Sequence, residues 1–193
     1  MLEFGLFALL LLLGGSLIWH TFRTGISPVP TPPKVARTFA RGLDEVIVNA
    51  ETPPRHACEL GCGWGSLLIP SAKRIPHLHW RAWERSPLPY AITRLRLMLQ
   101  LGGKQRARIQ CFRRDFLKAD LRDADVILCY LFPGAMTALA DKFLREGLPN
   151  GWLISHTFRL PGHEPWRTYQ ADDLYRTPVY IYRLGEPGPK QSI

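Results

Sequence analysis

The sequence of 193 residues contains only four cysteines, and neither they nor the six histidines have the spacing of a zinc site. Cys58, Cys62, Cys111 and Cys129 lie within or beside apolar runs that are typical of strands. Thiols in such positions are expected to be buried and reduced in a cytoplasmic domain. The sequence therefore predicts neither a metal site nor a disulfide framework, and it contains no internal repeat.

Formal charge is absent from Phe4 to Phe22, and most of this stretch is Leu, Phe, Ala, Gly and Ile. As a helix the segment would reach roughly 28 Å, close to the thickness of a bilayer core. A cleaved secretory signal is the alternative, but Glu3 precedes the run without any Lys or Arg, and no clear cleavage site follows. Four basic residues follow the run: Arg23, Lys34, Arg37 and Arg41. We therefore expect a single-pass membrane anchor with the main domain in the cytoplasm.

Acidic residues are in the minority, because 25 Lys and Arg stand against 16 Asp and Glu and give a formal charge of +9. Such a balance favours an anionic partner. The apolar amino terminus makes a membrane surface a better candidate than nucleic acid. The length suits one globular domain with a small appendage. We expect an anchor over residues 1–22, a proline-rich linker over 23–34 and one domain over 35–193.

The rest of the sequence alternates apolar runs with helical periodicity. The predicted strands are His56 to Leu60, Leu78 to Trp83, Arg108 to Phe112, Val126 to Leu131, Trp152 to Phe158 and Val179 to Arg183. The predicted helices are Lys34 to Val48, Gly65 to Arg74, Pro89 to Leu101 and Met136 to Arg145. Strand and helix in alternation predict an α/β domain with a mostly parallel sheet. Residues 166–170 and 179–183 could close it as an antiparallel hairpin.

Glycines and carboxylates gather where the predicted strands end. Gly61, Gly63 and Gly65 follow the first strand, where a side chain would block a ligand that approaches the backbone. Glu84 ends the second strand, and a carboxylate there can accept both hydroxyls of a ribose. Asp115 follows the third strand and can accept an exocyclic amine. With Glu59 beside the end of the first strand, three successive strand ends carry an acid, and together they predict a nucleoside site.

The glycine spacing favours one kind of nucleoside. A dinucleotide fingerprint requires G-x-G-x-x-G/A, but here the third glycine comes one residue early and Ser66 occupies the expected place. Glu59, just before the turn, would repel a phosphate and attract cationic amine and sulfonium groups. S-adenosylmethionine carries both groups.

These residues resemble the class I S-adenosylmethionine-dependent methyltransferases from about Lys34 onward. The resemblance implies a Rossmann-like, seven-stranded, mostly parallel sheet with an antiparallel C-terminal strand, which here would follow one transmembrane helix. It also implies that S-adenosylmethionine contacts the following residues: Glu59, Gly61, Cys62, Gly63, Gly65, Glu84, Arg85, Asp115 and Phe116.

Several segments are similar to a narrower family, the small membrane-anchored protein-lysine methyltransferases that modify the adenine nucleotide translocase and the ATP synthase c subunit. They are the apolar amino terminus, residues 30–32, residues 130–133 and residues 155–162. The resemblance implies a lysine of a membrane protein as substrate, with nucleic acid disfavoured. Trp64 departs from the family pattern, which usually has an acid at that position.

The resemblance places the reacting amine near Tyr130, Phe132 and Pro133, after the fourth strand. An aromatic, dry channel favours the neutral amine that must attack the sulfonium methyl. Rate would come mainly from positioning and exclusion of water. Trp152, His156 and Trp166 are weaker candidates, because late-strand aromatic residues usually pack in the core.

Three other functions stay open. The first is a methyltransferase that acts on a small molecule, a lipid or RNA. The second is a nicotinamide-dependent oxidoreductase, which Glu59 and the glycine spacing disfavour. The third is a membrane-tethered nucleoside-binding module without activity, which Trp64 keeps open.

Overall fold

The computed structural model describes residue 15 and residues 29–185. The predicted anchor, apart from Gly15, and residues 23–28 of the predicted linker lie outside these residues. Among the described helices, none has the length and apolar character needed to cross a membrane.

Helices and strands alternate along the described chain. In order they are α2 (Pro33–Asn49), β1 (His56–Leu60), α3 (Leu68–Arg74), β2 (His79–Trp83), α4 (Pro87–Gln100), α5 (Gly103–Arg106), β3 (Ile109–Phe112), the 3-10 helix η1 (Phe116–Lys118), β4 (Val126–Cys129), α6 (Pro133–Glu146), β5 (Trp152–His156), β6 (Arg167–Gln170) and β7 (Pro178–Arg183).

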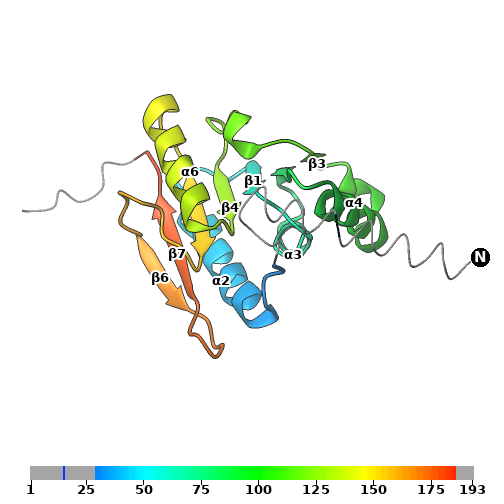
Figure 1. Ribbon diagram of the computed structural model, residues 1–193, viewed down its shortest axis with the longest axis horizontal. Coiled ribbons are helices and arrows are strands. Elements are labelled where there is room, and N and C mark those ends of the chain that lie inside the picture. Colours follow the sequence, from blue (N-terminus) through cyan, green and yellow to red (C-terminus); the bar gives the residue numbers. More distant parts are fainter. Residues whose placement is uncertain (1–14, 16–28, 186–193) are drawn as a thin grey trace, which may run out of the picture.

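The strands form one seven-stranded sheet in the order β3-β2-β1-β4-β5-β7-β6 (Figure 1). Parallel pairing joins β3, β2, β1, β4 and β5, whereas β7 runs antiparallel to both β5 and β6. Leu60, the last residue of β1, pairs with Trp83 and with Cys129, the last residues of β2 and β4. The strand ends are therefore level, and the loops after them meet at one edge. This architecture is Rossmann-like and confirms the predicted sheet.

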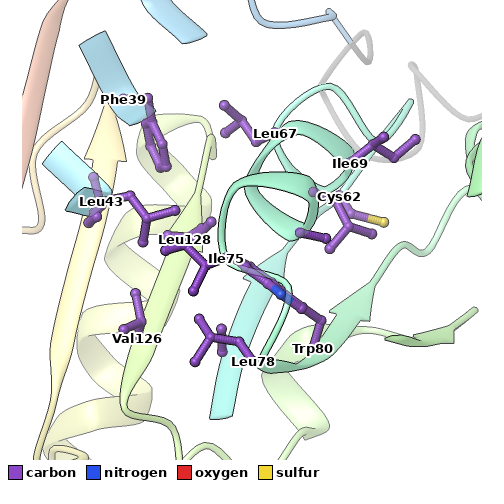
Figure 2. Packing of buried hydrophobic residues seen from close by; sticks show 14 of the residues in the cluster. Phe39, Leu43, Cys62, Leu67, Ile69, Ile75, Leu78, Trp80, Val126 and Leu128 are labelled. Carbon is purple, nitrogen blue, oxygen red and sulfur yellow. The ribbon is translucent and has the colours of Figure 1, made fainter. Parts of the chain in front are cut away.

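Two apolar clusters cover the two faces of the sheet. One joins buried residues of α2, α3 and α4, among them Phe39, Leu68 and Leu97, to the sheet through Trp80 and Leu128. Figure 2 shows Phe39 and Leu43 from α2 packed toward Leu128 and Val126. The other cluster packs α6 on the opposite face through five residues of this helix: Ala135, Met136, Leu139, Ala140 and Phe143. Burial on both faces explains why β4 is apolar at every position.

Several boundaries differ from the prediction by one to three residues, and two of these differences have clear local reasons. The helix expected from Gly65 begins at Leu68, because Gly61, Gly63 and Gly65 all adopt positive φ angles that a helix does not contain. The strand expected to reach Leu131 ends at Cys129. The chain then turns into α6, whose first residue is Pro133. The sequence pattern did not predict α5 or η1.

Along the helix predicted from Pro89 to Leu101, the residues Ile92, Leu95 and Leu99 form an apolar stripe at helical spacing. The helix is present as α4, but this stripe is not the face that packs on the sheet. Pro89, Thr93 and Leu97 are buried, whereas Leu95 and Leu99 are 49% and 76% exposed. Periodicity shows which residues share a face and does not show what covers that face.

Candidate functional site

A cavity of about 360 Å³ opens where the parallel strands end. Its wall is formed by residues from the loops after β1, β2, β3 and β4 and by two segments distant in sequence. Ten of the twelve predicted site residues line it: Glu59, Gly61, Cys62, Gly63, Glu84, Arg85, Asp115, Phe116, Tyr130 and Phe132. Gly65 and Pro133 are not among the lining residues.

The turn after β1 has a backbone that requires glycine. Gly61 and Gly65 both have φ near +71°, in the left-handed region. A Cβ on Gly65 would approach Thr93 within 3.2 Å, and one on Gly61 would approach Leu131 within 3.1 Å. Gly65 therefore lies outside the cavity wall but sets the shape of the turn. The Gly65 N–H closes it by donating to the Cys62 carbonyl at 2.8 Å.

Glu84 connects this turn to the end of β2. Its Oε2 accepts the Gly63 N–H at 2.9 Å, and its Oε1 accepts the Ser86 N–H at 2.7 Å. Each carboxylate oxygen has a further lone pair, so Glu84 can accept two more hydrogen bonds from a ligand in the cavity. Glu84 is 9% exposed, so such bonds would form largely out of water.

Glu59 is a buried acid at the floor of the cavity. It is 3% exposed, and its Oε2 has no hydrogen-bond partner within the described part of the chain. Burial, and after it the neighbouring Glu84 carboxylate, raise the pKa of Glu59 well above the ordinary value. An unpaired buried carboxyl group is costly. A cationic ligand group would supply the missing partner.

Asp115 is the third acid of the cavity and follows β3, two strands away from β1, which carries Glu59. It caps η1 by accepting the Leu117 N–H at 3.0 Å, and its Oδ2 is 3.9 Å from the Arg85 guanidinium. Phe116, which follows it, is half-buried against the cluster under α6. The carboxylate and the ring border the same cavity, as expected for a group that contacts a purine.

The aromatic side of the cavity comes from the loop after β4. Tyr130 and Phe132 line it, while Pro133 begins α6 and acts as a helix start. A Cβ on Gly134 would lie 2.8 Å from the Phe132 ring. Gly134, which the sequence analysis did not identify, therefore gives this ring its place in the wall.

A second unpredicted group is formed by the segment before α2. The Thr31 N–H donates to Ser66 Oγ at 3.1 Å, and Thr31 Oγ1 lies 3.1 Å from His156 Nε2. The His156 ring stacks on Tyr130 with 3.9 Å between centroids. Burial lowers the pKa of His156 to about 4, so the ring is neutral at pH 7. His156, a weaker candidate in the sequence, thus positions both Tyr130 and Thr31.

A third unpredicted group fastens the glycine turn to α4. Thr93 is fully buried and donates its hydroxyl to the Gly63 carbonyl at 2.6 Å. The Arg96 guanidinium donates to the Trp64 carbonyl. Both side chains belong to one face of a helix whose pattern indicated only packing, so no sequence signal distinguished them.

The three acids and the glycine turn fit S-adenosylmethionine. Glu59 lacks a partner that a ligand ammonium would supply, Glu84 retains acceptor capacity for hydroxyls, and Asp115 and Phe116 offer an acceptor and a ring for adenine. Within the described residues, no group of three or more His, Cys, Asp or Glu side chains could hold a metal ion.

Comparison with known proteins identifies relatives of this chain. The family model of the ANTKMT methyltransferase domain matches residues 59–167, more than half of the chain. A protein-lysine N-methyltransferase of Saccharolobus islandicus (strain REY15A) is 26% identical over 164 residues, which cover 82% of this chain and 93% of the relative.

Solved structures agree with the fold. The RNA methyltransferase from Salinibacter ruber, in complex with S-adenosyl-L-homocysteine, is 25% identical with a TM-score of 0.66 and covers 84% of this chain and 97% of its own. The magnesium protoporphyrin IX methyltransferase from Synechocystis PCC 6803, with bound S-adenosylmethionine, has a TM-score of 0.57 at 14% identity. It covers 77% of this chain and 78% of its own, and its likeness extends to the fold alone.

Proposed function

We propose that this chain, which belongs to the ANTKMT methyltransferase domain family and is an S-adenosylmethionine-dependent methyltransferase, methylates the side-chain amine of a lysine in a protein. The observation that carries the proposal is the juxtaposition of the acids with the aromatic wall of Tyr130 and Phe132 in one cavity. The protein-lysine substrate is supported by the activity named for the Saccharolobus relative.

In this reaction, bound S-adenosylmethionine supplies a methyl group on a sulfonium: the amine lone pair forms the new N–C bond, the S–C bond breaks to leave a thioether, and the product loses a proton to solvent. The residues of the chain contribute binding and orientation. Glu59 would hold the ammonium group of the donor, Glu84 would hold its ribose, and Asp115 with Phe116 would hold its adenine. The aromatic wall of Tyr130 and Phe132 would receive the amine. Positioning of this kind accounts for most of the rate in such transfers.

Tyr130 and Phe132 would also help to keep the attacking amine neutral. A lysine has a pKa of about 10.4 in water, and an apolar wall disfavours its charged form. Tyr130 is half-buried, and its ring is held against His156, so its orientation is fixed before substrate arrives. Its hydroxyl, or a neighbouring carbonyl, would accept a hydrogen bond from the amine.

We further propose that residues 1–22 anchor the enzyme in a membrane, with the catalytic domain in the cytoplasm and a membrane protein as substrate. This proposal is supported by the uncharged run from Phe4 to Phe22 and the basic residues after it. Deletion of residues 1–22 should transfer the protein from the membrane fraction to the soluble fraction. The membranes are washed at high salt, which weakens attachment through basic residues but not through an apolar span. Retention of the truncated chain after this wash would contradict the anchor.

RNA is the second candidate substrate, because the Salinibacter relative is named an RNA methyltransferase and this chain carries a formal charge of +9. Incubating membranes and total RNA from a deletion strain with enzyme and labelled methyl donor would distinguish the two. Label in protein, mapped to lysine by mass spectrometry, supports the first proposal. Label that ribonuclease removes and protease leaves would replace it with the second.

A further inference from the structure

The solvent-facing side of α4 carries an apolar stripe. Leu95, Met98 and Leu99 are 49%, 53% and 76% exposed, and by helix spacing they share one face with Leu88 and Ile92. The buried residues of α4 lie on the opposite face. Leu97 joins the core cluster under the sheet, so α4 is already fully packed on that side. The exposed stripe therefore needs another explanation.

The part of the chain that carries this stripe is strongly basic. Residues 85–114 contain eight Lys and Arg and no Asp or Glu. Within residues 29–185, Arg85 alone among these eight forms an ion pair, with Asp115 at 3.9 Å. By helix spacing, Arg94 and Arg96 flank the two sides of the stripe, and Lys104 and Arg106 follow on α5. Uncompensated cations beside exposed leucines are typical of a helix that rests on an anionic bilayer surface.

We propose that the exposed face of α4, with α5, docks on the headgroup region of a membrane that contains anionic lipid. The charge excludes a second copy of the same face as occupant, because a two-fold contact would bring like charges together. The chain's own apolar run from Phe4 to Ile18 carries no charge and would leave the cations without a partner. RNA is disfavoured because the exposed stripe is aliphatic, whereas bases stack on aromatic rings.

The position of α4 fits such a contact. It begins at Pro87, directly after Glu84, Arg85 and Ser86, which line the cavity. Figure 1 shows α4 at the β3 end of the molecule, away from β6 and β7. If residues 1–22 are the anchor, residues 23–32 could separate the domain from the bilayer by no more than about 35 Å even when fully extended. A docked α4 would hold the cavity at a fixed height above the membrane.

The inference deepens the proposed membrane location and can be tested apart from it. The full chain is reconstituted into phosphatidylcholine vesicles, with or without phosphatidylglycerol, after Leu99→Cys has been labelled with an environment-sensitive fluorophore. The matched control is Leu144→Cys, because Leu144 is 80% exposed on α6, which packs on the opposite face of the sheet. The wild-type chain, labelled in the same way, gives the background from the native cysteines.

Docking predicts a blue shift, and quenching by spin-labelled lipid, at position 99 only when phosphatidylglycerol is present, and neither effect at position 144. Adding Lys104→Gln and Arg106→Gln should reduce the docked fraction relative to the undocked one by on the order of tenfold. High salt should act in the same direction.

Three results would overturn the proposal. Equal quenching at positions 99 and 144, or at position 99 in both kinds of vesicle, would show that anionic lipid does not attract this face. A blue shift that is present before vesicles are added would show that the chain itself or a second copy covers the stripe. A shift produced by RNA and not by vesicles would identify a nucleic-acid surface. None of these results bears on lysine methylation, which the labelling of membranes tests separately.

Discussion

The backbone N–H of Gly63 donates a hydrogen bond to the Glu84 carboxylate at 2.9 Å. This bond links the turn after β1 to the end of β2, although 21 residues separate the two in sequence. Parallel pairing of Leu60 with Trp83 brings both strand ends to the same level, so that the bond can form. One side chain therefore both fixes the glycine turn and faces the cavity.

Glu84→Ala should weaken S-adenosylmethionine binding at least tenfold. The variant loses hydrogen bonds to a charged acceptor, which contribute about 1.5 to 3 kcal/mol each. Titration calorimetry with S-adenosylmethionine and with S-adenosylhomocysteine measures the loss, which should be similar for both because they share the ribose. Glu51→Ala, at an exposed acid outside the cavity, is the control. Equal affinities for Glu84→Ala and the wild type would remove Glu84 from the site.

Glu59→Gln should abolish a proton release that accompanies ligand binding. Burial, and after it the Glu84 carboxylate, raise the pKa of Glu59 well above its ordinary value, so the ligand-free protein keeps the proton on Glu59 to a higher pH than an exposed acid would. A ligand ammonium would stabilise the carboxylate and release the proton. Calorimetry in two buffers of different ionisation enthalpy measures this release, and 5′-methylthioadenosine, which lacks the amine, should show none.

The same raised pKa has a consequence for stability. The folded state binds a proton that the unfolded state releases, so ligand-free stability falls as pH rises above the unfolded pKa of Glu59. Glu59→Gln should remove this fall, which thermal melts across the pH range would record. A melting profile with the same slope in both proteins would contradict the assignment.

Thr93→Val should remove the hydrogen bond that holds the glycine turn against α4, without leaving a cavity in the core. The substitution nearly preserves volume but leaves the Gly63 carbonyl without its donor at 2.6 Å. We expect S-adenosylmethionine affinity to fall several-fold and unfolding free energy to fall by about 1 kcal/mol. Thr137→Val is the matched control, since Thr137 donates to the Pro133 carbonyl on α6. Equal losses of affinity in the two variants would show that Thr93 has no special role.

Because His156 is buried, we expect the free energy of unfolding to fall in acid. Burial lowers its pKa to about 4, below the ordinary 6.5, so the unfolded state binds the proton more readily. Stability is therefore full above pH 6.5 and declines as pH falls toward 4, by on the order of 3 kcal/mol in total.

His156→Gln should flatten this acid limb, even though its stability at pH 7 will be lower because the stack on Tyr130 is lost. Chemical denaturation at several pH values measures the slope. His77→Gln, at an exposed histidine, should retain the slope of the wild type. An unchanged slope in His156→Gln would assign the acid limb to another group.

Much of the candidate site could be predicted because its residues follow strand ends. Glu59 and Gly61 flank the last residue of β1, Glu84 directly follows β2, and Asp115 follows β3. These strands pair in parallel, and the pairing brings their ends to the same level. Tyr130 and Phe132 were found in the same way, after β4. Wherever parallel pairing fixes the register of the strands, the place of a residue at the end of a predicted strand therefore predicts its place at the edge of the sheet.

Residues outside that register could not be predicted. Thr31 and His156 lie 125 residues apart and meet because α2 packs across β5 and β7. Thr93 reaches Gly63 because α4 covers the turn. These contacts depend on how helices pack on the sheet, and a periodic pattern carries no information about a helix's neighbours.

The sequence by itself determined the alternation of strands and helices, the glycine turn and the acids at the strand ends. These features depend on hydrophobic periodicity and local propensity, which short runs of residues already contain. Only the tertiary structure decided which face of α4 is buried, that Glu59 has an unpaired oxygen, and that His156 contacts Thr31 and Tyr130 beside the cavity. Burial and contact between distant segments arise from packing of the whole chain, and packing is a property of three dimensions.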